Sequence, residues 1–199
     1  MKTTITILIS FLFIFTTPKI YSQYSEEEKN GLLYTLQEEK AAYDFYKSMF
    51  EKYNQKVFGN VMDAEKSHMQ HVTDVINELN IDASVIDLTP GQFTNKDVNN
   101  IYEEMMKIGA FSFSDALRAA ARYEENDILD LRKFYSKAEN EKIKALYDCL
   151  DKATQNHMRA FAKNLKSEDI IYNPTVLTAD EYNEIINSKN QSGDCFQTK

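Results

Sequence analysis

Four long segments of the sequence repeat apolar or aromatic residues at alternating steps of three and four, the spacing of one face of an α-helix. They cover residues 32–53, 58–79, about 112–132 and about 140–166. Short connections join the first to the second and the third to the fourth, so each pair is expected to form an antiparallel hairpin. The chain has only five Gly and three Pro, and its apolar and polar residues do not alternate with the two-residue period of strands. The sequence therefore predicts an all-α protein.

The remaining segments predict the connections of a helical bundle. Residues 25–28 read Ser-Glu-Glu-Glu, a capping box that begins the first helix. Residues 80–112 form a connection long enough to cross from one end of a bundle to the other, with a short amphipathic helix of its own at 95–107. A second capping box at 178–181 begins another short helix. We therefore expect a four-helix bundle of two antiparallel hairpins with a long crossover and short accessory helices.

The two ends of the chain differ from the middle in composition. Residues 1–22 combine Lys2, an apolar run and a small polar residue at Ser22, which is typical of a secretory signal peptide cut after that residue. Residues 23–187 are then one domain, and the polar residues 188–199 a flexible tail. The sequence thus predicts a soluble, exported protein, periplasmic or secreted, with no membrane contact after signal removal. An uncleaved anchor is the alternative.

Charge and cysteine content narrow the classes of partner. The net charge of -8, without a basic cluster, argues against nucleic acid as a partner. The absence of a Cys-x-x-Cys pair argues against a cysteine zinc site and a thioredoxin-type redox motif. Cys149 and Cys195 can pair in an oxidising compartment if the fold brings them together. The oligomeric state, a homodimer included, is left open.

Each predicted long helix carries an ionisable residue within its apolar face. These residues are Glu39 on the first, Glu65 and His68 on the second, Glu124 on the third and His157 on the fourth. A carboxylate in an apolar interior must be protonated, paired or bound to a cation. Residues three apart share a helical face, so Glu65 and His68 can reach one point. Their occurrence on four helices favours a divalent metal site.

Each of these residues, taken alone, also fits an ordinary structural role. His68 or His157 can be a hydrogen-bonded core histidine, and Glu39 can extend to water from the edge of its face. Glu125 replaces Glu124 as the inward residue if the phase of that helix is shifted by one. A metal-free polar core, in which these groups pair with one another, is therefore the competing interpretation.

The constellation resembles that of the ferritin-like superfamily, with one Glu from each of two helices and a Glu-x-x-His from each of the other two. Glu39, with a small residue three positions on and Tyr46 seven on, resembles the first-helix pattern. Glu65-Lys66-Ser67-His68 matches the second-helix motif, and Glu124 takes the third-helix position. The two hairpins with a long crossover resemble the topology of that superfamily.

More closely, the chain resembles the bacterial family known as domain of unknown function 2202. The stretches that carry this resemblance lie between about residues 32 and 186: LLYTLQEEKAAYDFY, AEKSHMQHV, ALRAAARYEENDILDL, NHMRAF and LTADEYNEII. The resemblance implies a ferritin-like fold but no particular activity, since the family's name records none.

One position departs from the superfamily pattern. The fourth helix reads Thr154-Gln155-Asn156-His157, with Thr154 where the motif has Glu. Three carboxylates and two imidazoles remain, so a pair of divalent ions would leave one excess positive charge. Water, hydroxide or Asp127, one turn from Glu124, can fill the gap, or the site can hold one ion only.

The resemblance implies an iron or manganese site, because mixed carboxylate and imidazole ligands suit these ions, although they do not exclude zinc. In that arrangement Glu65 bridges two ions, Glu39 and Glu124 are terminal ligands, and His68 and His157 hold one ion each. The implied chemistry is oxidation of ferrous iron or reduction of oxygen or peroxide. The alternative is a non-catalytic helical scaffold that binds no metal.

Overall fold

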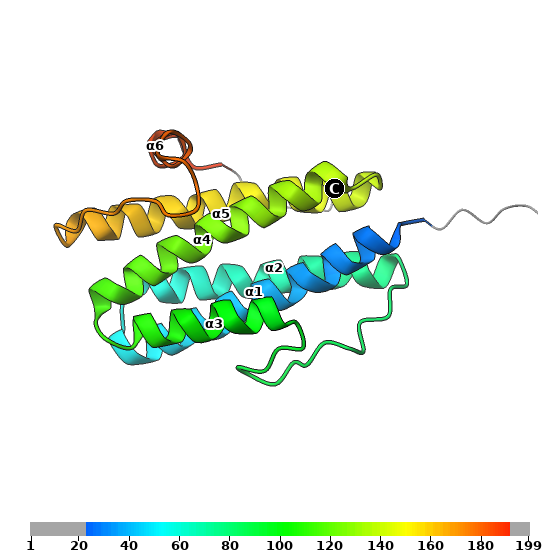
Figure 1. Cartoon of the computed structure of the whole chain (residues 1–199), viewed down its shortest axis with the longest axis horizontal. Coiled ribbons are helices and arrows are strands. Elements are labelled where there is room, and N and C mark those ends of the chain that lie inside the picture. Colours follow the sequence, from blue (N-terminus) through cyan, green and yellow to red (C-terminus); the bar gives the residue numbers. More distant parts are fainter. Residues whose placement is uncertain (1–22, 192–199) are drawn as a thin grey trace, which may run out of the picture.

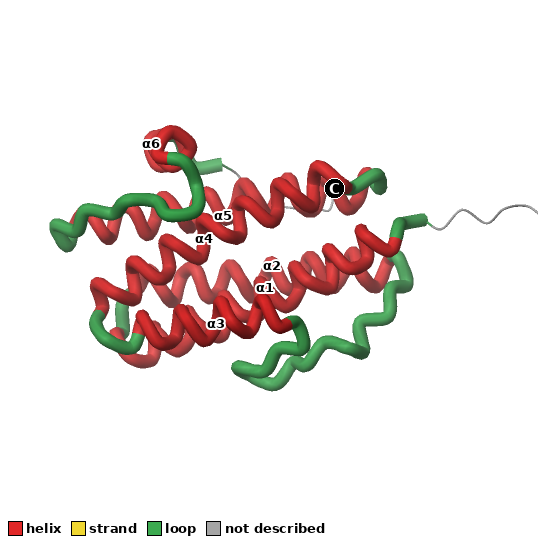
Figure 2. The backbone as a smooth tube through the Cα atoms, viewed as in Figure 1, coloured by secondary structure: helices red, strands yellow, loops and turns green. Residues whose placement is uncertain are grey.

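The computed structural model describes residues 23–191 as helices and loops, with no strand in that range (Figures 1 and 2). The all-helical prediction is confirmed. The described residues form six helices, α1 (Glu26–Tyr53), α2 (Lys56–Glu78), α3 (Lys96–Gly109), α4 (Phe113–Lys137), α5 (Glu141–Ser167) and α6 (Ala179–Asn187).

The four long helices pack in a ring, each against two neighbours. α1 pairs with α2 and α4 pairs with α5, while α1 also contacts α4 and α2 contacts α5. Within each pair the chain reverses at a short turn, so the partners are antiparallel (Figure 1). The loop after α2 leads along the outside of the ring into α3, which packs on α1 and α4, and α6 packs on α5.

Helix α4 is longer than the sequence predicted. It was expected to end near residue 132, but it continues to Lys137. Phe134 explains the difference, because its ring packs 5.4 Å from that of Tyr34 and 5.8 Å from that of Tyr147. This contact keeps the last turns of α4 against the interior, although two charged residues, Arg132 and Lys133, precede Phe134 in the sequence.

The apolar interior consists of two clusters with a polar layer between them. Along α1, Leu36 belongs to one cluster and Phe45 to the other. Along α5, Leu150 belongs to the cluster of Leu36, and Phe161 belongs to the cluster of Phe45. On α1, Glu39 lies between Leu36 and Phe45, and the buried polar residues of α5 lie between Leu150 and Phe161. The polar layer is therefore enclosed by apolar packing at both ends.

Helix α1 is buried on several sides rather than on one face. The consecutive residues 37–40, all polar, are all buried. Gln37 accepts hydrogen bonds from the backbone amides of Thr94 and Asn95, both 2.9 Å long. Lys40 pairs with Asp44 at 2.9 Å and donates to the carbonyl of Thr89 at 2.8 Å. The loop between α2 and α3 thus covers a face that the sequence pattern left exposed.

Several predictions concern residues outside the described range. The predicted signal peptide, residues 1–22, and most of the predicted tail lie there. Cys149 is buried on α5, but Cys195 lies outside the described residues, so their pairing stays a prediction. Within residues 23–191, none of the helices combines the length and the apolar character required to cross a membrane.

Candidate metal centre

The four long helices bring the five predicted ligand residues together in the polar layer. Glu39 comes from α1, Glu65 and His68 from α2, Glu124 from α4 and His157 from α5. All five side chains are buried, with His157 the most exposed at 7%. Glu65, His68 and His157 each offer one ligand atom, and these atoms lie within 4.8 Å of one another.

Glu65 is the centre of the arrangement. Its Oε2 lies 2.8 Å from Nδ1 of His68, and its Oε1 lies 3.1 Å from Nδ1 of His157. The first contact follows from the three-residue spacing on α2, which places both side chains on one face. The second joins α2 to α5 across the interior. One carboxylate therefore faces a different imidazole with each of its oxygens.

A second carboxylate flanks each histidine. Glu39 Oε2 lies 3.1 Å from Nδ1 of His68, and Glu124 Oε2 lies 3.4 Å from Nδ1 of His157. The centre thus has two similar halves that share Glu65: Glu39 with His68, and Glu124 with His157. Each half thus presents one carboxylate and one imidazole beside the shared carboxylate of Glu65.

The two imidazole rings lie close and nearly parallel. Their centroids are 5.2 Å apart, and the ring planes differ by 17°. If both rings are protonated, two like charges face each other in a buried site, and only the surrounding carboxylates offset that repulsion. Neutral imidazoles carry no such charge, and a ring that binds a cation uses the lone pair of the nitrogen that would otherwise hold the proton.

The pKa values of these groups shift in opposite directions. Burial lowers the pKa of His68, but the charges of Glu39 and Glu65 outweigh it and raise that pKa to about 9. The pKa of His157 is raised in the same way by Glu65 and Glu124. Burial raises the pKa of Glu39 to about 8, whereas the pKa of Glu65 falls below its usual value because His157 and His68 outweigh its burial. The centre therefore strongly attracts positive charge.

Three atoms of the centre that could bind a metal lack a hydrogen-bond partner: Oε1 of Glu39, Oε2 of Glu124 and Nδ1 of His157. His157 lies near two carboxylate oxygens, but neither contact has the direction of a hydrogen bond. Buried polar atoms without partners are costly. Carboxylate oxygens and imidazole nitrogens in a dry interior suit divalent cations. A cation in the half with His157 would satisfy Oε2 of Glu124 and Nδ1 of His157, and a cation in the half with His68 would satisfy Oε1 of Glu39.

Neighbouring residues orient Glu124 and separate it from Glu125. The Tyr46 hydroxyl donates a hydrogen bond to Oε1 of Glu124, which leaves Oε2 on the side of His157. Glu125 is also buried but points away from the centre, and its Oε2 accepts hydrogen bonds from the backbone amides of Val176 and Leu177 at 2.7 and 2.8 Å. Glu124 is thus part of the centre, and Glu125 holds the loop before α6.

Thr154 occupies the position where the superfamily pattern has a fourth carboxylate, and its side chain binds the carboxylate of Asp127 instead. Its hydroxyl donates to Oδ2 of Asp127 at 2.7 Å. Asp127 is buried, and its Oδ1 has no hydrogen-bond partner. Burial and then the charges of Glu39, Glu38 and Glu124 raise the pKa of Asp127 well above its usual value. Asp127 therefore lies within the electrostatic field of the centre, although it is not one of the converging ligand groups.

Glu38 belongs to the same polar layer but was not predicted. It is 2% exposed, and neither of its carboxylate oxygens has a hydrogen-bond partner. Burial and the charges of Asp130 and Glu39 raise its pKa well above the usual value. The periodic pattern of α1 gives no signal for this residue, because its position lies off the apolar face. Only the packing of α4 on that side buries it.

Comparison with known proteins identifies the family. A family model described as an uncharacterized protein domain, DUF2202, matches residues 28–189. The chain belongs to the DUF2202 family. All five predicted ligand residues lie within the matched range, so the centre is part of the DUF2202 domain itself.

One relative is similar in sequence over nearly the whole chain, and its crystal structure has a similar fold. The uncharacterized protein MJ0754 of Methanocaldococcus jannaschii is 36% identical over 181 residues, which span 91% of this chain and 97% of that protein. A crystal structure of the hypothetical protein MJ0754 from Methanococcus jannaschii DSM 2661 has a TM-score of 0.81 and 37% identity, and the match covers 84% of this chain and 95% of that one. Neither name records an activity, so the function of this DUF2202 protein must be argued from its site.

The different roles of Glu124 and Glu125 can be tested with matched amide substitutions. Glu124→Gln removes a charge that raises the pKa of His157, so we expect that pKa to fall in the metal-free protein. Glu125→Gln leaves the pKa of His157 within a few tenths of its original value and weakens hydrogen-exchange protection of the amides at residues 175–177. NMR titration of the imidazole and amide exchange measure both effects. A larger shift of the His157 pKa in Glu125→Gln would contradict the assignment.

Proposed function

We propose that the protein is a ferritin-like metalloprotein whose polar layer holds two divalent cations, iron or manganese, bridged by Glu65. The observation that carries this proposal is the position of Glu65, whose two oxygens lie 2.8 and 3.1 Å from different histidines. Each of these histidines has a further carboxylate beside it. The ring of four long helices, with a long connection after the second, supports a ferritin-like bundle.

The residues divide between the two positions. Glu39 and His68 would hold one cation, Glu124 and His157 the other, and Glu65 both. Three carboxylates leave one excess positive charge on two divalent ions, and Asp127 can offset it, because it is buried one turn from Glu124 with one oxygen unpartnered. Carboxylate and imidazole donors suit iron and manganese, and zinc remains an outcome of the metal analysis.

The chain itself orients the side chains of the centre, excludes bulk water and provides groups that bind protons. A metal pair bound there would catalyse the oxidation of ferrous iron or the reduction of oxygen or peroxide. Tyr46 fixes the orientation of Glu124 through its hydroxyl. The apolar clusters on both sides exclude bulk water, which strengthens electrostatic interactions within the layer. The raised pKa of His68, about 9, favours a protonated ring before metal binds, and binding at this ring would release that proton.

Export forms a separate part of the proposal. The composition of residues 1–22 supports cleavage after Ser22 and action outside the cytoplasm. The charge of -8 supports metal ions, rather than nucleic acid, as partners.

The alternative function is a helical scaffold with a metal-free polar core. One observation favours it: Nδ1 of His68 already lies within hydrogen-bond distance of both Glu39 and Glu65. A protonated histidine between two carboxylates would stabilise the layer without a cation. Thr154, in place of a fourth carboxylate, is consistent with this alternative.

Metal content tests the proposal directly. Protein purified without chelators and loaded with Mn²⁺ or Fe²⁺ is expected to hold about two ions per chain, as a bridged pair requires. We expect His157→Ala to retain about one ion and Glu65→Gln to retain fewer, because Glu65 serves both positions. Elemental analysis of folded protein measures this. The exposed Glu184→Gln is the control and should bind as the parent does. Equal metal content in the parent and Glu65→Gln would refute the bridged centre.

The pH dependence of stability separates the two functions. The folded-state pKa of His68, about 9, lies above its ordinary value of 6.5, so its stabilising contribution is complete below pH 6.5 and is lost as pH rises through 9. The pKa of Glu39, raised from 4.5 to about 8, also favours the folded state at lower pH. We therefore expect the Tm of chelator-treated protein to fall between about pH 6.5 and 9.

Metal binding should show the opposite trend over this interval. Protons compete with cations for the same donor atoms, so the increase in Tm on adding Mn²⁺ is expected to grow as pH rises. Differential scanning calorimetry at several pH values measures both trends. A metal-free scaffold would show the fall in Tm with no increase from Mn²⁺ at any pH.

A further inference from the structure

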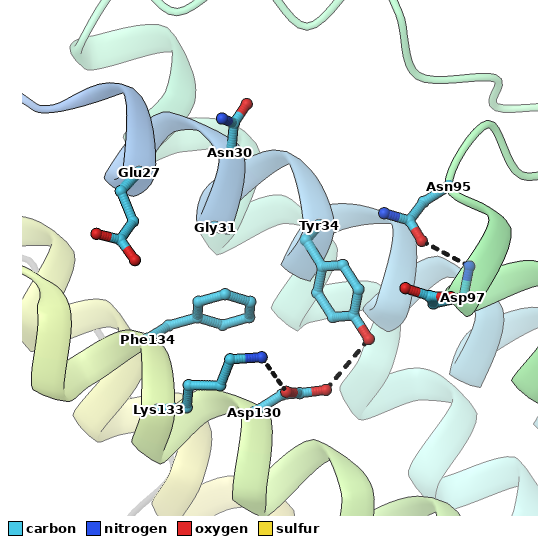
Figure 3. Close-up of a pocket in the computed structure, with 9 residues that line it drawn as sticks. All are labelled: Glu27, Asn30, Gly31, Tyr34, Asn95, Asp97, Asp130, Lys133 and Phe134. Carbon is cyan, nitrogen blue, oxygen red and sulfur yellow. Dashed lines mark hydrogen bonds and ion pairs between the residues drawn. The ribbon is translucent and has the colours of Figure 1, made fainter.

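A pocket of about 690 Å³ opens between α1 and α4, beside the start of α3 (Figure 3). Three carboxylates line it, those of Glu27, Asp97 and Asp130, against the ammonium group of Lys133. Lys137 pairs with Glu27 at 2.5 Å. Asp130 lies at the inner side of the pocket, where the Tyr34 hydroxyl donates to its Oδ2 at 3.1 Å and Lys133 binds its Oδ1 at 3.2 Å (Figure 3).

A line of carboxylates continues from this pocket along the contact between α1 and α4. Glu38 lies one helical turn beyond Tyr34 on α1, and Asp127 lies one turn before Asp130 on α4. Two residues of the centre lie beyond them: Glu39 follows Glu38 on α1, and Glu124 lies one turn before Asp127 on α4. Because α1 and α4 pack together, the two series run side by side from the pocket to the metal ligands. We call Asp130, Glu38 and Asp127 the acidic seam.

The inner members of the acidic seam have carboxylate oxygens without a hydrogen-bond partner. Glu38 is 2% exposed and Asp127 4% exposed, while both oxygens of Glu38 and Oδ1 of Asp127 have no hydrogen bond. The pKa of Tyr34 is raised by burial and by the charges of Glu38 and Asp130, so both carboxylates lie near this hydroxyl. Such oxygens are costly in a dry interior unless positive charge neutralises them. They therefore add acidic groups beyond the five side chains of the centre.

Approach from either end of the polar layer passes through apolar side chains. One cluster, with Phe45, Phe58 and Phe161, fills the interior on one side of the polar layer, and the other, with Leu32, Val75 and Leu150, fills the opposite side. A cation that loses its water among such side chains pays a large desolvation cost. Carboxylate oxygens along the acidic seam can replace that water step by step.

We propose that the acidic seam is a transient binding path by which a divalent cation moves from the pocket at Asp130, past Glu38 and Asp127, to the centre. This inference rests on the proposed metal centre. Lys133 acts as the gate, because its ammonium group occupies Oδ1 of Asp130 and must leave before a cation binds there. Its side chain is 55% exposed, so it can move into solvent without breaking the interior packing.

The rate of loading tests the path separately from the binding capacity of the centre. Metal-free full-length protein is mixed with Mn²⁺ alone, and the loss of the EPR signal of free Mn²⁺ is followed in time. Glu38→Gln is expected to slow loading by at least about tenfold, with the final stoichiometry unchanged. Lys133→Gln is expected to speed loading by about two- to fivefold at low ionic strength, an effect that high salt removes. Glu184→Gln, an exposed acid on α6, is the control and keeps the parent rate.

Each outcome decides between the path and the centre. If the parent loads and both substitutions load at its rate, the path is refuted while the proposed function stands. If Glu38→Gln lowers the stoichiometry instead of the rate, Glu38 is a ligand and the path is likewise refuted. If the parent takes up no Mn²⁺, the proposed function fails and the path with it. If circular dichroism shows that Glu38→Gln is unfolded, two other variants decide the question. Lys133→Gln should still speed loading, and Asp130→Asn, which removes a carboxylate of the pocket, should slow it.

Discussion

The burial of three carboxylates and two imidazoles in one layer is the constraint on which the rest of the structure depends. Charges in an apolar interior must be neutralised by one another or by a cation, because the loss of hydration is costly. The four long helices hold these groups in fixed positions, and the two apolar clusters close the layer at both ends. Glu65 links the two halves, since its oxygens face different histidines. The proposed metal pair would satisfy the donor atoms that remain unpartnered.

The contacts around α1 connect the fold to the site. Gln37 and Lys40 fasten the loop before α3 on one side of the helix. The Tyr123 hydroxyl donates to the backbone carbonyl of Glu38 at 2.5 Å and joins α4 on another side. Glu39 then faces the centre, so one helix positions a ligand and contributes to the acidic seam. Many polar residues of α1 are buried because the loop before α3, helix α4 and the centre cover different sides of this helix.

Periodicity predicted much of this architecture, and the reasons for its failures are physical. The four long helices follow from apolar spacing, and the five candidate ligand residues could be chosen because each interrupts an apolar face. The phase of α4 was uncertain by one residue, and only the amides that bind Glu125 separate it from Glu124. Glu38 could not be found, because a contact between helices, rather than its own position in the pattern, buries it. The extension of α4 through Phe134 likewise depends on rings from other helices.

The most direct test of the central claim is a crystal structure of the Mn²⁺-loaded protein with anomalous diffraction data. The proposed centre predicts two anomalous peaks about 3.5–4 Å apart, one on each side of Glu65. One peak should lie next to Glu39 and His68, and the other next to Glu124 and His157. Anomalous peaks only at surface carboxylates, with Glu65 still paired to both histidines, would contradict the claim and leave the polar layer as a metal-free core.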